Sequence, residues 1–207
     1  MLSLRAVKYS YGANEINYSD WEVDTGSHSL IIGNSGSGKT TLLHLIGGLM
    51  KVSEGRLEIN GHELKAMKGN ELDKFRGKNI GIVFQHPHLV RSLTVKDNLT
   101  LAQTLSGFRK DPMKVEETLN KLDISDLQKR KVHQLSQGQA QRVSIARAVI
   151  SEPKLLLADE PTASLDDENA NRVIKLLRDQ AESSNATLIV ATHDQRVKKE
   201  FKNKLTL

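Results

Sequence analysis

Short apolar runs recur along the chain, and glycine-rich or polar turns separate them. Four of these runs are almost wholly apolar, namely residues 29–32, 80–84, 155–158 and 187–192. Runs of this length between turn residues are typical of strands that are buried on both faces of a parallel sheet. Segments with helical spacing lie between them. The pattern therefore predicts an α/β domain with a mostly parallel central sheet.

The N-terminal part of the chain has a different pattern. Apolar positions alternate or cluster over residues 2–9 and 16–23, and turn residues stand at 12–14 and 24–26. Residues 55–61 form a further short alternating segment between two glycines. These are signals of short strands joined by turns. We therefore expect antiparallel β-structure beside the parallel sheet.

The stretch between the second and third apolar runs is polar and helical. Thr94 is an N-cap candidate for a helix whose apolar face consists of Val95, Leu99, Ala102 and Leu105. An Asp-Pro pair opens a second helix over residues 111–122, and residues 140–150 form a third. The pattern predicts one domain over residues 1–207, with a helical subdomain inserted at about residues 86–150.

Two more helices are expected outside this insertion. One covers residues 70–76, with Asn70 as its candidate N-cap, and one starts at residues 164–166 and runs toward Ser184. Near the C-terminus, basic and apolar residues alternate. This stretch favours a solvated helix face followed by a terminal strand over a binding patch, and its basic residues are Lys198, Lys199, Lys202 and Lys204.

A glycine-rich octet follows the first apolar run and precedes a helical segment. Its spacing is that of a P-loop, G-x-x-x-x-G-K-[ST], in the required strand–loop–helix context. The residues expected to contact phosphate are Gly33, Asn34, Ser35, Gly36, Ser37, Gly38, Lys39, Thr40 and Thr41. Glycine backbone and a helix N-terminus suit an anion, Lys39 suits the β/γ-phosphates, and the Thr40 hydroxyl suits Mg²⁺. The alternative is a flexible Gly/Ser linker before a helix.

Polar side chains stand directly after the other three apolar runs. Asp159 and Glu160 follow 155–158, Gln85 follows 80–84, and His193 follows 187–192. A buried carboxylate pair is costly unless cations or donors compensate it. A metal–phosphate site supplies that compensation, with Asp159 at Mg²⁺ and Glu160 at an attacking water. A helix cap is the alternative for the acidic pair, and local structural roles are the alternatives for Gln85 and His193.

Two weaker signals complete the candidate site. Ser136 and Gly138 stand just before the helix at 140–150, which gives a second helix N-terminus able to face phosphate. Alone, this segment is an ordinary helix-initiating turn. Tyr11 is a candidate to stack on an adenine base, although an isolated aromatic more often serves packing.

Composition narrows the class of protein. The 207 residues include no cysteine, and no apolar run is long enough to span a bilayer or to form a signal peptide. The net charge is +5, but 30 basic and 25 acidic residues are interspersed and aromatics are only 4%. That mixture argues against nucleic acid as a partner. We expect a cytoplasmic protein whose membrane connection comes through a partner.

The order of these motifs resembles that of the ATP-binding cassette (ABC) ATPases over nearly the whole chain. Residues 33–40 match the Walker A motif, Gln85 the Q-loop and Leu135–Gln139 the signature, with Gln137 where glycine is usual. Residues 155–159 with Glu160 match Walker B and the catalytic glutamate. Residues 164–166 match the D-loop and His193 the switch histidine, and Tyr11 falls where the family's adenine-stacking aromatic lies.

The resemblance implies a head-to-tail homodimer that encloses two ATP molecules. Each nucleotide would lie between Walker A of one subunit and Ser136, Gly138 and Gln139 of the other. Hydrolysis would use Glu160, His193 and Lys39, with Mg²⁺ held near Thr40, Gln85 and Asp159.

Residues 84–99 are most similar to short bacterial cassettes of the lipoprotein-releasing, macrolide-exporting and cell-division types. That similarity implies an ATPase on the inner face of the cell membrane, with a coupling helix of a membrane subunit docked near Gln85. It would drive either export or mechanical transmission. The alternative is a soluble ABC-type ATPase acting on nucleic acid or ribosomes. Against it, the chain lacks the long coiled-coil insertion and the second cassette of such relatives.

Overall fold

Five parallel strands form the central sheet of the computed structural model, which describes residues 1–12, 14–163 and 165–207. Their order across the sheet is β10-β4-β9-β8-β7. Their bounds are β4 (His28–Ile32), β7 (Ile80–Val83), β8 (Leu155–Asp159), β9 (Thr187–Thr192) and β10 (Asn203–Thr206). The four apolar runs each supply one of these strands, and the predicted α/β class is confirmed.

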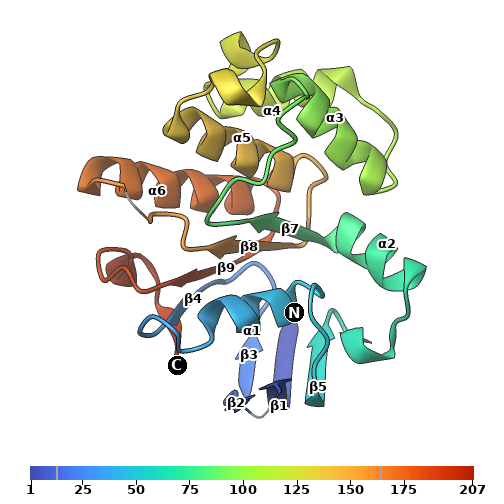
Figure 1. Cartoon of the computed structure of the whole chain (residues 1–207), viewed down its shortest axis with the longest axis vertical. Coiled ribbons are helices and arrows are strands. Elements are labelled where there is room, and N and C mark those ends of the chain that lie inside the picture. Colours follow the sequence, from blue (N-terminus) through green and yellow to red (C-terminus); the bar gives the residue numbers. More distant parts are fainter. Residues whose placement is uncertain (13, 164) are drawn as a thin grey trace.

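A second, antiparallel sheet lies below the first in Figure 1. It consists of β1 (Leu2–Tyr11), β2 (Asn14–Asn17), β3 (Trp21–Val23), β5 (Glu54–Ile59) and β6 (His62–Glu63). The antiparallel prediction is confirmed, but residues 16–23 form two strands rather than one. The turn predicted at 12–14 includes Ala13, which lies outside the described residues.

A bulge in β1 is the reason for that division. The register against β5 shifts between Arg5 and Lys8, and Ala6 has a positive φ of 47°. On one side of the bulge β1 pairs with β3, and on the other with β2. The carboxylate of Asp20 accepts a hydrogen bond from the Ala6 N–H at 2.7 Å. This bond satisfies an amide that the bulge withdraws from the ladder.

Helix α1 (Lys39–Ile46) fills the space between the two sheets. Its buried residues include Leu42, Leu43, Leu45 and Ile46. They belong to one apolar cluster with Ile31 and Leu157 of the parallel sheet and Leu57 and Ile59 of the antiparallel one. Helix α1 begins at Lys39, the seventh of the eight residues of the phosphate-loop motif. Its packing therefore fixes the loop between two rigid layers.

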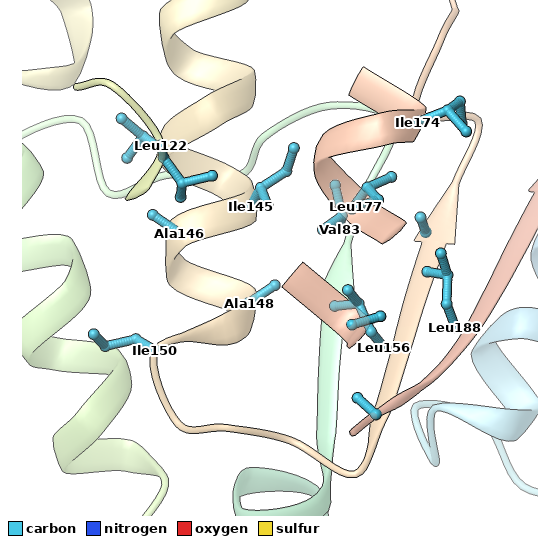
Figure 2. Packing of buried hydrophobic residues seen from close by; sticks show 14 of the residues in the cluster. Val83, Leu122, Ile145, Ala146, Ala148, Ile150, Leu156, Ile174, Leu177 and Leu188 are labelled. Atoms are coloured by element: carbon cyan, nitrogen blue, oxygen red, sulfur yellow. The ribbon is translucent and has the colours of Figure 1, made fainter. Parts of the chain in front are cut away.

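The remaining helices are α2 (Asn70–Asn79), α3 (Val95–Leu105), α4 (Pro112–Lys121), α5 (Gln137–Val149) and α6 (Asp167–Ser183). Helices α3 to α5 lie at one end of the molecule, and their apolar side chains share one cluster with α6 and the upper face of the parallel sheet. Figure 2 shows residues of α5 and α6 in this cluster together with Val83, Leu156 and Leu188. Helix α5 approaches β7 closely, since a Cβ on Gly81 would lie 2.3 Å from the Ala148 carbonyl oxygen.

Several local predictions can now be compared with the structure. Thr94 forms a capping box with Asp97, and Asp111 caps α4, as predicted. The Asn70 prediction is wrong, because Gly69 is the N-cap of α2 and Asn70 is its first helical residue. Leu105 is 73% exposed, although Val95 and Leu99 on the same predicted face are buried.

The C-terminal basic stretch is less helical than predicted. A four-residue 3-10 turn, η4 (Val197–Glu200), replaces the expected helix, and β10 follows it as the expected terminal strand. Among the helices that the structure describes, none combines the length and apolar composition required to cross a bilayer.

Candidate functional site

A cavity of about 610 Å³ opens where β4, β7, β8 and β9 end, the edge at which parallel sheets present ligand sites. It brings together most of the residues predicted from sequence. Its lining consists of Tyr11, Asn14, Ile16, Ser35, Gly36, Gly38, Lys39, Thr40, Thr41, Gln85, Glu160 and His193. Residues from six separate segments of the chain thus meet at one edge of the sheet.

The loop before α1 adopts a conformation that depends on glycine. Gly36 and Gly38 have φ of 80° and 94°, in the left-handed region that other residues rarely occupy. Gly38 is the N-cap of α1 and supplies no side-chain cap, so the first-turn amides are available to an anion. A Cβ on Gly33 would lie 2.5 Å from the Ser37 Oγ. The loop therefore has the backbone of a phosphate cradle.

Lys39 lies at the centre of this loop. Its ammonium group is buried and donates hydrogen bonds to the carbonyl oxygens of Gly33 and Asn34, both at 2.9 Å. It also lies 3.8 Å from the Oε1 of Glu160. The loop carbonyls thus hold a cation between the phosphate cradle and the carboxylate.

Asp159, the last residue of β8, is buried and accepts a hydrogen bond from the Thr40 hydroxyl at 3.2 Å. Burial raises the pKa of its carboxyl group, since the charged form is poorly solvated there. The described residues contain no cluster of three or more His, Cys, Asp or Glu side chains suited to a metal. A hydroxyl, one carboxylate and the Gln85 amide fit Mg²⁺, which takes few protein ligands and completes its shell with phosphate and water.

Glu160 has a positive φ of 42°, and its N–H donates to the Ala191 carbonyl at 2.8 Å. Its carboxylate accepts hydrogen bonds from the Thr192 hydroxyl at 2.7 Å and from the His193 backbone at 3.1 Å. The Nδ1 of His193 lies 2.8 Å from the same carboxylate. The side chain of Glu160 is 11% exposed and that of His193 61%. A held carboxylate and a solvent-accessible imidazole therefore face the cavity side by side.

Tyr11 lines the cavity next to α1, and Tyr18 contacts the phosphate loop from outside the lining. Tyr11 is 49% exposed, packs edge-to-face on Tyr9 with centroids 4.6 Å apart, and its hydroxyl lies 3.1 Å from the Thr41 Oγ1. The buried Tyr18 hydroxyl donates to the Gly38 carbonyl at 3.1 Å, and burial raises its pKa to about 12. Tyr18 thus supports the phosphate loop, a role that no motif in the sequence signals.

Three predicted residues lie elsewhere. Ser136, Gly138 and Gln139 line a second cavity of about 780 Å³, beside Leu165 just before α6 and Asn169 in its first turn. The Ser136 hydroxyl accepts from the Gln139 N–H, and the Gln139 side chain accepts from the Ser136 N–H, in a capping box at the start of α5. Within one chain the signature segment and the phosphate loop therefore belong to different cavities.

The segment after β8 is tied to the loop after β9. Ser164 of the predicted D-loop lies outside the described residues, but the Leu165 carbonyl accepts from the Arg196 guanidinium at 3.3 Å. The same guanidinium pairs with Asp194 and Asp167. Its hydrogen bonds lower the pKa of the Asp194 carboxyl to about 2. Arg196 thus joins the D-loop to the strand end that carries His193.

A second arginine links the segment after Gln85 to α5. The Arg147 guanidinium donates to the carbonyls of His88 and Pro87 at 2.6 and 2.9 Å. Burial lowers the pKa of Arg147, although its guanidinium remains charged. The Q-loop region and the helix that begins at the signature are thereby coupled through one side chain.

Residues 16–163 match the model of the family described as ABC transporter. The chain belongs to the ABC transporter family. This family membership confirms the resemblance that the motifs carry, and it explains why the phosphate loop, the acidic pair and the histidine meet at one cavity.

Relatives within the ABC family support the same conclusion. The chain is 39% identical over 173 residues to the putative ABC transporter ATP-binding protein MG467 of Mycoplasma genitalium. That match covers 84% of this chain and 56% of MG467, so the chain spans little more than half the length of that relative. It is also 34% identical to the lipoprotein-releasing system ATP-binding protein LolD of Buchnera aphidicola, over 93% of this chain and 87% of LolD.

The ABC fold is also shared with a solved structure. The dimeric structure of MJ0796, a bacterial ABC transporter cassette, superposes with a TM-score of 0.89 at 32% identity. The match covers 100% of this chain and 94% of that one. A dimeric post-hydrolysis state of MJ0796 bound to ADP and Pi matches equally well. The P-loop NTPase fold predicted from the sequence is thus confirmed.

Proposed function

We propose that the chain is the ATP-binding and ATP-hydrolysing subunit of a membrane ABC transporter complex. The observation that carries this proposal is the position of Glu160, whose carboxylate contacts His193 and lies 3.8 Å from Lys39 at the phosphate-loop cavity. The similar MJ0796 cassette in a state with ADP and Pi supports the hydrolytic part.

ATP binding would use the loop and its neighbours. The amides at the start of α1 and the Lys39 ammonium bind the phosphates, and Tyr11 stacks on the adenine. Thr40, Asp159 and Gln85 would hold a Mg²⁺ ion, which would supply positive charge to the phosphates. The contacted loop residues are Gly33, Asn34, Ser35, Gly36, Ser37, Gly38 and Thr41.

Hydrolysis then follows from the surroundings of Glu160. Its carboxylate accepts a proton from a water molecule, whose oxygen attacks the γ-phosphorus while the bond to the ADP oxygen breaks. Thr192 and the His193 backbone fix the carboxylate in place. The His193 ring donates toward the γ-phosphate, and Lys39 stabilises the charge that accumulates on it.

A second copy of the chain would complete the site. Ser136, Gly138 and Gln139 lie in a different cavity from the phosphate loop of their own chain, so they are available to the γ-phosphate of a partner's nucleotide. The structure of MJ0796, which is similar over the full chain, is dimeric, and this supports an assembly of two copies. We propose a head-to-tail homodimer with two ATP molecules between the subunits.

The membrane subunit would dock in a groove next to the Q-loop region, separate from the nucleotide cavity. This groove, about 640 Å³, is lined by residues of α2, β7, α3 and α5, among them Ile82 and Leu105, and by the loop residues Leu49 and Phe84. Its apolar floor and its nearness to Gln85 suit a short coupling helix of a membrane protein. On this proposal residues 1–207 act as one nucleotide-binding domain at the inner face of the membrane, with residues 86–150 as its helical subdomain.

The decisive experiment uses Glu160→Gln, which retains the shape of the side chain and one acceptor oxygen but cannot accept the proton. We expect ATP binding at wild-type strength, turnover reduced by roughly 10²-fold or more, and an ATP-stabilised dimer in size-exclusion chromatography. Glu58→Gln, on β5 of the antiparallel sheet and outside the nucleotide cavity, is the matched control. Unchanged turnover in the Glu160 variant would remove that residue from catalysis.

The partner is tested separately by affinity purification from membranes in mild detergent. An integral membrane protein should copurify with the wild type, and Leu49→Asp in the groove should lose it while keeping ATP binding. Recovery of the same membrane protein with the wild type and with Leu49→Asp would contradict the assignment of the groove.

A further inference from the structure

Exposed apolar side chains are concentrated at one edge of the helical segment. The described residues include six large apolar side chains that are exposed, and three of them lie within nine residues. These are Leu105 at 73%, Phe108 at 47% and Met113 at 81% exposure. They stand at the end of α3, in the following loop and in the first turn of α4. We call residues 105–113 the α3–α4 edge.

Two cations accompany these side chains. Arg109 and Lys110 are exposed, and neither forms an ion pair within the part of the chain that the structure describes. The one acidic residue of the edge, Asp111, is occupied as the N-cap of α4, where it accepts from the N–H groups of Met113 and Lys114 at 2.9 and 3.0 Å. The edge therefore combines apolar surface with two exposed cations that form no ion pair among the described residues.

Hydrogen bonds to Gln103 hold the loop of the α3–α4 edge in place. Gln103, which is 3% exposed, donates to the Asp111 carbonyl at 3.3 Å and accepts from the Asp111 N–H at 3.1 Å. The Phe108 N–H donates to the Gln103 carbonyl at 3.0 Å. These three bonds close the loop at its base. A fixed loop presents its side chains at little entropic cost on binding.

The edge also continues the groove assigned to the membrane subunit. Leu105 lines that groove together with Leu49, itself one of the six exposed apolar side chains. Figure 1 shows the α3–α4 connection along the outer margin of the helical segment, beyond α2 and away from α1. A membrane protein seated in the groove would bring a bilayer to this side of the molecule.

We propose that the α3–α4 edge binds the surface of a bilayer that contains anionic lipid. Phe108 and Met113 enter the boundary between headgroups and acyl chains, while Arg109 and Lys110 remain at the lipid phosphates. Apolar side chains alone would suit any protein partner, but adjacent unpaired cations add complementarity to a negative surface. The inference rests on the proposed function only for the nearness of a membrane.

The test is flotation of the purified full chain, without any membrane subunit, on lipid vesicles. Vesicles of phosphatidylcholine alone are compared with vesicles of two parts phosphatidylcholine and one part phosphatidylglycerol. Arg109→Ser/Lys110→Ser should lower the partition coefficient on anionic vesicles roughly 30-fold. Phe108→Ser/Met113→Ser should lower it about tenfold. Lys198→Ser/Lys199→Ser removes the same charge from an exposed site on η4 and should float like the wild type.

The outcomes separate cleanly. The edge residues lie outside the catalytic and nucleotide contacts, so all three variants should keep wild-type ATP turnover, which also shows that they are folded. If Arg109→Ser/Lys110→Ser and Lys198→Ser/Lys199→Ser lower the partition coefficient equally, the binding depends only on net charge. That result would overturn the proposal. Wild-type flotation of the edge variants with loss of the copurifying membrane protein would make the edge a protein interface, which also overturns it. Neither result depends on the outcome for Glu160→Gln.

Discussion

The Nδ1 of His193 lies 2.8 Å from the Oε1 of Glu160, although the two residues are 33 positions apart in the chain. The pairing of β8 with β9 produces this contact, because Asp159 stands opposite Ala191 in parallel register. The residues that follow the two strands must therefore meet. A hydrogen bond between a buried carboxylate and an accessible imidazole is the chemical centre of the site.

His193→Ala removes the imidazole but leaves the backbone N–H that supports Glu160. We expect turnover to fall roughly 10²-fold, with ATP affinity within a few-fold of wild type, because the phosphate loop is untouched. Steady-state hydrolysis and equilibrium nucleotide binding measure the two effects. His62→Ala serves as the control, because His62 lies on β6 of the antiparallel sheet and does not line the cavity. A loss of binding equal to the loss of turnover would assign His193 to affinity instead.

Lys39→Ala removes the buried ammonium group of the phosphate loop. The free energy of ATP binding should become less favourable by about 2–5 kcal/mol, because a charge-assisted contact to phosphate is lost in a poorly solvated site. Fluorescent-nucleotide titration measures it, and Lys68→Ala, an exposed lysine, should bind like the wild type. Affinity retained in the Lys39 variant would contradict the assignment of the phosphate loop.

Arg147→Ala leaves the carbonyls of Pro87 and His88 without their donors. We expect a loss of about 2–4 kcal/mol in the free energy of unfolding, and faster hydrogen exchange in the segment after Gln85. Arg147→Lys should recover part of this, because an ammonium can reach one carbonyl but cannot bridge two as a planar guanidinium does. The exposed Arg91→Ala is the control. Equal free energies of unfolding for Arg91→Ala and Arg147→Ala would show that the Arg147 hydrogen bonds to Pro87 and His88 do not stabilise the fold.

The Arg196–Asp194 pair predicts a pH dependence of stability. The folded pKa of Asp194 is about 2, below its ordinary value of 3.8. Its contribution is therefore complete above pH 3.8 and is lost as the pH falls toward 2. At neutral pH it amounts to at most about 2 kcal/mol.

Arg196→Ala should remove most of that contribution at pH 7 and flatten the acid limb of the stability curve. Denaturant unfolding at several pH values measures it. Arg172→Ala breaks an exposed pair with Glu168 and should cost less than about 1 kcal/mol. Parallel acid limbs for the wild type and the Arg196 variant would show that the pair does not govern this transition.

Strand positions were predictable because burial on both faces leaves a continuous apolar signal. The residues at the strand ends were predictable for a related reason: polar groups directly after such a run have few structural explanations. Thr94 and Asp111 combine cap residues with helical spacing, and both caps are confirmed.

Other features depend on contacts that sequence spacing does not encode. The division of residues 16–23 follows from a bulge at Ala6 in another strand, and the Tyr18 support of the phosphate loop from the packing of two sheets. Asn70 resembled a cap because its residue type is common at that position, but the N-cap is Gly69, whose φ of 45° and ψ of −114° suit a residue without a side chain. Arg196 bridges segments 31 positions apart, with no motif to mark it.

The separation of Ser136 from the phosphate loop has a consequence for kinetics. If the active unit needs both segments from different copies, turnover requires that two copies associate. The rate per molecule should then rise with protein concentration and reach a plateau once dimers predominate, as mass action requires. A membrane subunit that seats two cassettes side by side replaces bulk concentration with an effective local one. Its first contribution to the cycle would be proximity, before any force passes between the proteins.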